Sequence, residues 1–165
     1  MPLLIRKIEE QKWRQNDILH GAEVSADAIT GCLRTYQNTL SLWKVESEEE
    51  INDAVLAIVS FFDKADTIDI VKIDPALLEE KSLKYEPSIG KTAYTYFENR
   101  HFDLIELSYK KLGFVADVIV SCLRNNKNQR FYRKEIKNLI REGLDTGKID
   151  KKDLKPKLIE DLKLL

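Results

Sequence analysis

Five cationic side chains recur at helical intervals near the end of this 165-residue sequence. They lie in a segment that we expect to be helical from Gln129 to Leu144, and they are Arg130, Arg133, Lys134, Lys137 and Arg141. At about 100° per residue, all five fall within a sector of about 100°. Glu135 and Glu142 lie at the flank of this sector, so no acidic side chain interrupts it. Such a stripe attracts phosphates or an acidic protein surface. The alternative is a solvated helix face, or a face paired with acidic residues of the same chain.

A second candidate group lies in the segment Glu98-Asn99-Arg100-His101-Phe102-Asp103. Its two carboxylates and one imidazole could bind a divalent metal or supply an acid and a base. The alternative is a polar helix start in which His101 is hydrogen-bonded. Because no second cluster has a metal-ligand spacing, we expect no metal and no cofactor. Convergence of this group with Asp69 or Asp74 in one cleft would favour an enzyme.

Two further motifs favour a structural role. The segment Gly90-Lys91-Thr92 has the ending of a phosphate-binding loop, but Tyr85 stands where that motif needs its first glycine. Cys32 and Cys122 lie in apolar, helix-like segments, which favours buried free thiols in a reducing compartment.

No apolar run approaches the ~20 residues of a membrane span. We therefore expect a cytoplasmic protein that does not bind membranes.

Composition bounds the class of protein. Hydrophobic residues are 43% and charged residues 33% of the chain, a balance that excludes wholesale disorder. The net charge of −1 hides a split: residues 1–123 hold 14 Lys and Arg against 21 Asp and Glu, and residues 124–165 hold 13 against 7. The C-terminal part is therefore the basic part. The near-zero total counts against a general nucleic-acid binder.

The first half of the chain shows strands alternating with helices. Segments rich in β-branched and aromatic residues predict strands at Leu3–Ile8, Thr39–Val45 and Thr67–Ile73, with a fourth possible at Thr92–Phe97. Ser25 is a candidate helix N-cap, and Ser47 with Glu50 has the spacing of a capping box. The helices that begin at these caps would lie between successive strands, and parallel strands need such a crossover to connect them. The expected fold is therefore α/β (or α+β), with a small, at least partly parallel sheet and packed helices.

The second half is expected to be mostly helical. Apolar spacing predicts helices over His101–Leu123 and Gln129–Leu144, and a short amphipathic helix follows Pro156. That last helix should dock through Leu158, Ile159, Leu162 and Leu165. The length fits one globular domain, residues 1–165, with a mixed α/β portion over 1–97 and a helical portion over 98–165 that is basic from residue 124.

These features favour a non-catalytic interaction or regulatory protein that engages an anionic partner surface through its basic C-terminal helix. The expected partner is another protein or a second copy of the chain. A nucleic-acid-binding protein using the same stripe is the first alternative. An enzyme with a site around Glu98, His101 and Asp103 is the second. None of the motifs identifies a family.

Overall fold

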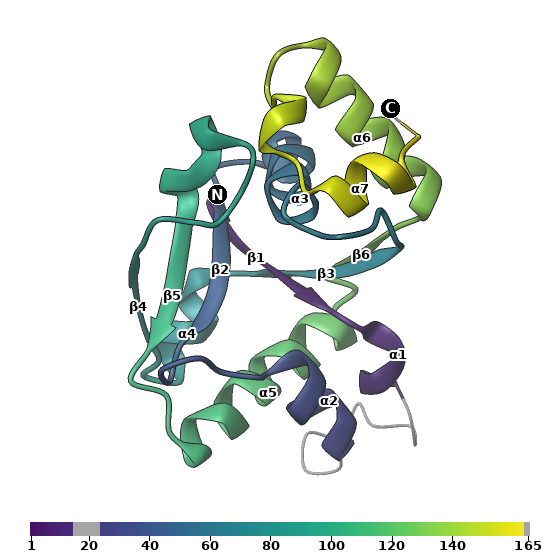
Figure 1. The fold of residues 1–165 in the computed structure, drawn as a ribbon. Helices are drawn as coiled ribbons and strands as arrows, with labels where there is room; N and C mark the ends of the chain where they lie inside the picture. Colours follow the sequence, from purple (N-terminus) through teal and green to yellow (C-terminus); the bar gives the residue numbers. More distant parts are fainter. Residues whose placement is uncertain (15–23, 164–165) are drawn as a thin grey trace.

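A computed structural model describes residues 1–14 and 24–163, and its centre is one six-stranded sheet with the strand order β4-β5-β2-β1-β3-β6 (Figure 1). Every neighbouring pair in the sheet is antiparallel. The strands are β1 (Leu3–Ile8), β2 (Leu40–Val45), β3 (Ile68–Ile73), β4 (Lys84–Pro87), β5 (His101–Ile105) and β6 (Asn128–Phe131).

The expectation of a partly parallel sheet is wrong. The strands β2 and β3 do run in the same direction, and the helix α3 (Ile51–Val59) lies between them in the chain, as a crossover requires. However, β1 separates them in the sheet and is antiparallel to both. Leu4 and Ile5 of β1 are both fully buried, because they face opposite sides of the sheet. The order of elements indicated strand direction, but it could not show which strand is central.

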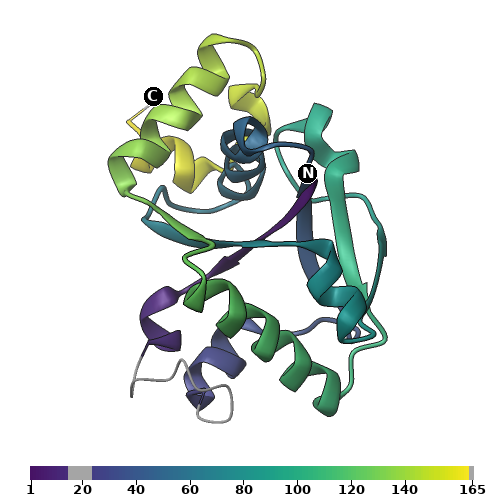
Figure 2. The same cartoon turned by 180° about the vertical axis from the view of Figure 1, so that it is seen from behind.

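Alternating side chains place one core on each face of the sheet. Leu4 and Ile8 of β1 belong to one core, and Ile5 belongs to the other. The core of Leu4 is covered by α1 (Glu10–Trp13), α2 (Ala26–Cys32), α4 (Pro75–Glu80) and α5 (Tyr109–Arg124). The core of Ile5 is covered by α3, α6 (Arg133–Asp145), α7 (Pro156–Asp161) and the 3-10 helix η4 (Thr95–Arg100). Figure 2 shows these two layers from behind, on either side of β1 and β3.

The second half is less helical than expected. His101–Ile105, placed by its sequence in a helix, forms β5, and α5 begins only at Tyr109, with Ser108 as its N-cap. The segment Thr92–Phe97 is not a strand, because η4 begins within it at Thr95. The backbone of β5 pairs with both β2 and β4, which are distant in sequence. Local apolar spacing contains no information about such pairing.

The two predicted caps have different outcomes. The cap at Ser25 is confirmed, since its hydroxyl accepts a hydrogen bond from the backbone N–H of Ala28 at 3.1 Å. The capping box at Ser47 is wrong, because that side chain makes no cap hydrogen bond. Glu50 instead accepts from the backbone N–H of Glu46 at 2.8 Å. The first turn there is the 3-10 helix η3 (Glu48–Glu50), which leads into α3.

The C-terminal helix docks on this chain. Leu158 and Leu162 are 0% and 1% exposed and belong to the core beneath α3 and α6, which confirms the predicted docking residues that the structure describes. Leu165 lies outside the described residues. A second 3-10 helix, η5 (Lys151–Asp153), precedes α7. Both cysteines are buried and free, as expected. No helix in the described ranges is long and apolar enough to cross a membrane.

Candidate anion-binding cleft

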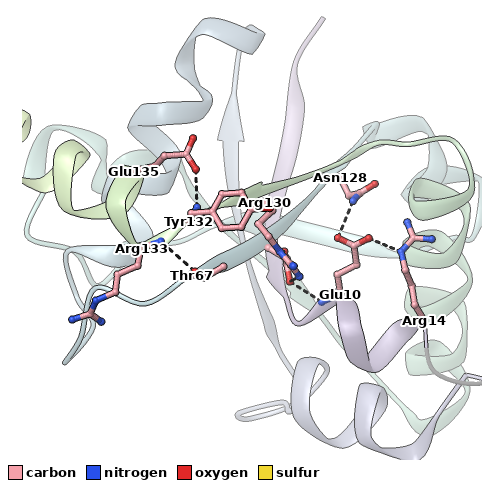
Figure 3. Close-up of polar contacts among 9 residues, drawn as sticks. Glu10, Arg14, Thr67, Asn128, Arg130, Tyr132, Arg133 and Glu135 are labelled. Carbon is pink, nitrogen blue, oxygen red and sulfur yellow. Dashed lines mark hydrogen bonds and ion pairs between the residues drawn. The ribbon is translucent and has the colours of Figure 1, made fainter.

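The predicted basic stripe does not lie on one helix. Arg130 is part of β6, and α6 begins three residues later at Arg133. The guanidinium of Arg130 donates two hydrogen bonds to the buried carboxylate of Asp69, at 2.7 and 3.0 Å. This carboxylate also accepts from the backbone N–H of Glu10, whose side chain binds Asn128 (Figure 3). Hydrogen bonding to Asp69 raises the pKa of Arg130. Arg130 therefore ties β6 to β3 and to the start of α1.

Arg133 is also held within the molecule. Its side chain forms ion pairs with Asp66 at 2.7 Å and with Asp161 of α7 at 2.6 Å. Its backbone N–H donates to the hydroxyl of Thr67 (Figure 3). Asp161 accepts a further hydrogen bond from the backbone N–H of Ala65, and this bond together with Arg133 lowers the pKa of Asp161. Arg133 thus joins the start of α6 to α7 and to the segment before β3.

Three predicted stripe residues remain on the surface of α6. Lys134 and Arg141 are exposed, and neither forms an ion pair within the described ranges. Lys137 is partly buried, and its amine approaches the backbone oxygen of Asp161 at 3.5 Å. The structure therefore brings together three of the five cations and places Arg130 and Arg133 in internal ion pairs. A role for the exposed three in partner binding stays a prediction.

The second predicted group is brought together only in part. His101 and Asp103 lie on one side of β5, whereas Glu98 belongs to η4. Burial lowers the pKa of His101, and its Nδ1 lies 2.7 Å from the hydroxyl of Ser88. The backbone oxygen of Glu98 accepts from the N–H of Gly90. These contacts hold the segment from Ser88 to Gly90 against β5, rather than at the start of a helix.

Carboxylates, imidazoles and thiols do not cluster in the part of the chain that the structure describes. No group of three or more His, Cys, Asp or Glu residues gathers there in a metal-binding arrangement. Asp69 is bound by Arg130, and Asp74 caps α4 by accepting from the backbone N–H of Ala76. Neither carboxylate converges with His101 and Asp103.

A different site opens where β1 and β2 separate. Their pairing ends at Ile5 and Trp43, although β1 stays paired with β3 as far as Ile8, and β2 stays paired with β5 back to Leu40. In Figure 1, β1 runs obliquely away from the upright β2. The sheet therefore has a split in its interior, between the ends of the two strands.

Arg6 lies in this split. Its side chain starts on the face of Leu4 and donates to the backbone oxygens of Ser41, at 2.7 Å, and Cys32. Its Nε is buried and has no hydrogen-bond partner in the described structure. No carboxylate of the described residues pairs with Arg6, and burial lowers its pKa to about 10, so the guanidinium stays charged at neutral pH. Arg6 as a whole is partly exposed, so its charge is only partly withdrawn from water. A charge withdrawn from water without a counter-charge is costly, and an anion beside it reduces that cost.

The split forms the floor of a cleft of about 610 Å³. Four cations and two carboxylates line it: Arg6, Lys7, Arg34, Lys91, Glu9 and Asp103. None of the four cations forms an ion pair with a described residue, whereas Glu9 is paired with Lys12 at 2.9 Å. The lining is therefore positive, although residues 1–123 as a whole are acidic. Oxyanions bind in such places through charge-assisted hydrogen bonds.

Apolar side chains form the mouth of the cleft. Phe61, just after α3, is 42% exposed, and the nitrogen of Lys155 lies 4.3 Å from the centroid of its ring. Ile89, between β4 and η4, is 69% exposed. Tyr36 also lines the cleft and is 76% exposed. Phe62 lies beneath the ammonium of Lys7, whose nitrogen is 5.2 Å from the ring centroid. Exposed apolar residues that gather around one hollow are a feature of binding sites.

The sequence contains one signal for this site. In the strand Leu3–Ile8, residues Leu4, Arg6 and Ile8 alternate on one face, so a lone arginine stands between two buried aliphatic side chains. An arginine that is partly buried between two aliphatic side chains of a central strand needs an explanation, since charged groups are seldom withdrawn from water without a partner. The other cleft residues come from distant segments and have no common sequence pattern.

Comparisons with protein-family models, with curated proteins and with solved structures gave no match. The ligand chemistry of the cleft is therefore inferred from its own residues.

Proposed function

We propose that this protein is a non-catalytic binding protein that recognises its partner through an anionic group held in the β1–β2 cleft. The observation that carries the proposal is the guanidinium of Arg6, which is charged, lies at the floor of the cleft and has no carboxylate partner among the described residues. Planar guanidinium groups bind carboxylates and phosphates through paired N–H donors. Two of the five N–H groups donate to Ser41 and Cys32, and the Nε–H is buried, which leaves one N–H on each terminal nitrogen for a ligand.

Binding explains the cleft better than catalysis does. Ser88 and His101 have the contact distance of a nucleophile and a base, but no carboxylate among the described residues is hydrogen-bonded to the imidazole to orient it. Asp103 influences His101 only through its charge. The same hydrogen bond satisfies a buried ring and fixes the loop after β4, which is a sufficient structural role.

The cleft also supports anion binding better than the outer side of α6. Lys134 and Arg141 are solvated cations on one helix, and such groups contribute little binding energy unless a partner desolvates them. In the cleft, cations from β1, the segment after α2 and the segment before η4 surround one hollow. Lys7, Arg34 and Lys91 are exposed, as Lys134 and Arg141 are, but Arg6 is partly buried. Electrostatic attraction is stronger at Arg6, because the protein excludes part of the water around it. A nucleic acid would need a longer track of cations than this hollow provides.

An NMR titration with inorganic phosphate tests the proposal. Amide resonances around Arg6, Cys32 and Ser41 should shift and saturate when phosphate replaces chloride at constant ionic strength. Arg6→Gln should weaken the apparent affinity at least tenfold, since it removes the charge and the fork of donors. Arg124→Gln is the matched control, because it removes an exposed arginine that neither lines the cleft nor belongs to the predicted stripe.

A second variant protects the test against misfolding, since Arg6 also binds two backbone oxygens. Lys91→Gln should weaken phosphate binding about two- to threefold and leave stability unchanged, because Lys91 is exposed and has no ion pair among the described residues. Absence of saturable shifts in the wild-type protein refutes the proposal. Equal affinity in the Arg6→Gln and wild-type proteins refutes it as well.

A further inference from the structure

The cleft combines two kinds of surface that an inorganic anion would not use together. One part of its lining is polar, with Arg6 in the split of the sheet and the exposed Ser41 beside it. Its mouth is apolar, with Phe61 and Ile89 exposed to solvent. A phosphate or acetate ion at Arg6 would leave Ile89 and the exposed part of Phe61 in water, where exposed apolar surface is unfavourable.

We infer that the ligand of the cleft is a small amphipathic organic anion, with a carboxylate or phosphate at Arg6 and an apolar body against Phe61 and Ile89. This inference rests on the proposed function. The volume of about 610 Å³ lies within the range of pockets that hold small organic ligands, roughly 300–1,000 Å³. An aromatic acid or an aryl phosphate fits both the size and the division into a polar floor and an apolar mouth.

The position of the cleft favours a small molecule over a peptide strand. Peptides that add a strand to a sheet pair with an exposed edge. This cleft lies in the interior of the sheet, between β1 and β2, and both strands are already paired on their other sides. The helix α2 ends on one side of the split, and α3 ends on the other side. A compact ligand can enter such a hollow without separating the strands further.

The loop that carries Ile89 is fixed, so the mouth is preformed. The backbone N–H of Ser88 donates to the oxygen of His101 at 3.0 Å, and the N–H of Gly90 donates to the oxygen of Glu98 at 3.1 Å. These bonds flank Ile89 on both sides. A preformed apolar wall reduces the ordering cost of binding, so each apolar contact contributes more to affinity.

Dissociation constants measured by the same NMR titration test the inference. Phenyl phosphate should bind about tenfold tighter than inorganic phosphate, and phenylacetate about tenfold tighter than acetate, because a partly buried ring contributes at least that factor. The two pairs distinguish a phosphate ligand from a carboxylate ligand. Benzyl alcohol, which has the ring without the charge, should bind at least tenfold more weakly than either aromatic anion.

Variants at the mouth separate this inference from the proposed function. Ile89→Ser and Phe61→Ser should remove most of the advantage of phenyl phosphate, while the affinity for inorganic phosphate stays the same. Tyr109→Ser is the matched control, since Tyr109 is 96% exposed and does not line the cleft. Equal affinity for phenyl phosphate and inorganic phosphate overturns the inference but leaves the proposed function standing. Tighter binding of an acidic peptide than of both aromatic anions also overturns it. Failure of every anion to bind overturns both.

Discussion

Substitution of Gly90 by alanine tests how the wall of the cleft is packed. Gly90 is buried, and a Cβ at this position would meet Cη2 of Trp43 well inside contact distance and would lie 2.8 Å from Cβ of His101. Neither neighbour can move freely. Trp43 is 6% exposed and stacks on Phe97, and His101 is held in β5. The clash must therefore be relieved by a shift of the loop itself.

The cost follows from these contacts. Overpacking of a well-packed site typically costs about 1–3 kcal/mol. A loop shift would also weaken the hydrogen bond from Gly90 to Glu98, worth about 1 kcal/mol. We expect Gly90→Ala to lower the free energy of unfolding by about 2–3 kcal/mol. For a chain of this size, that is a fall in the melting temperature of roughly 5–10 °C.

Gly113 provides the matched control, because the same chemical change should have the opposite sign there. It lies at an exposed position within α5, and an added Cβ would meet nothing within 4 Å. Gly113→Ala should raise stability by about 0.5–1 kcal/mol, since alanine loses less backbone entropy in a helix. Urea denaturation followed by circular dichroism measures both variants. An unchanged or higher midpoint for Gly90→Ala would refute the described packing of the loop on Trp43.

Three further substitutions test other parts of the structure. Ser25→Ala should lower the free energy of unfolding by about 1 kcal/mol, because it removes the acceptor for the backbone N–H of Ala28. Ser47→Ala should change it by less than about 0.5 kcal/mol, because the Ser47 side chain makes no cap hydrogen bond. Equal effects of the two substitutions in urea denaturation would contradict this difference. Leu158→Ala should lower stability by about 2–5 kcal/mol, since the side chain is fully buried under α3 and α6, and a neutral result would mean that α7 is not docked. Arg133→Glu should lower the denaturation midpoint more than Arg141→Glu, because only Arg133 faces Asp66 and Asp161, and the reverse order would show that these ion pairs do not hold α7 in solution.

Some local sequence signals predicted local structure, although the capping box at Ser47 and the helix expected from His101 were wrong. The strands at Leu3–Ile8, Thr39–Val45 and Thr67–Ile73 were found to within a residue, because β-branched side chains are dense there. The cap at Ser25 and the docking of Leu158 were also predicted, since each depends on side chains close in the sequence or on a plain apolar stripe. These features need no knowledge of the rest of the chain.

Features that depend on distant pairing were not predictable in this way. The central place of β1 follows from pairing with β2 and β3, and β5 is a strand because it lies between β2 and β4. The same limit applies to the site. Spacing grouped Arg130 with Arg133 as one helical stripe, but the structure places Asp69 beside the first and Asp161 beside the second. The cleft is identified by Arg6, which has no carboxylate partner among the described residues.

The most direct measurement is a ¹H–¹⁵Nε correlation spectrum of the arginine side chains during titration with phenyl phosphate. Nε of Arg6 has no hydrogen-bond partner among the described residues and belongs to the guanidinium that lines the cleft, so an anion bound to that guanidinium should change the chemical shift of Nε. The Arg6 signal should shift and saturate with the dissociation constant obtained from the amide resonances, while the Arg141 signal stays in place. Saturable binding that leaves the Arg6 signal unmoved would contradict the assignment of Arg6 as the anion-binding residue.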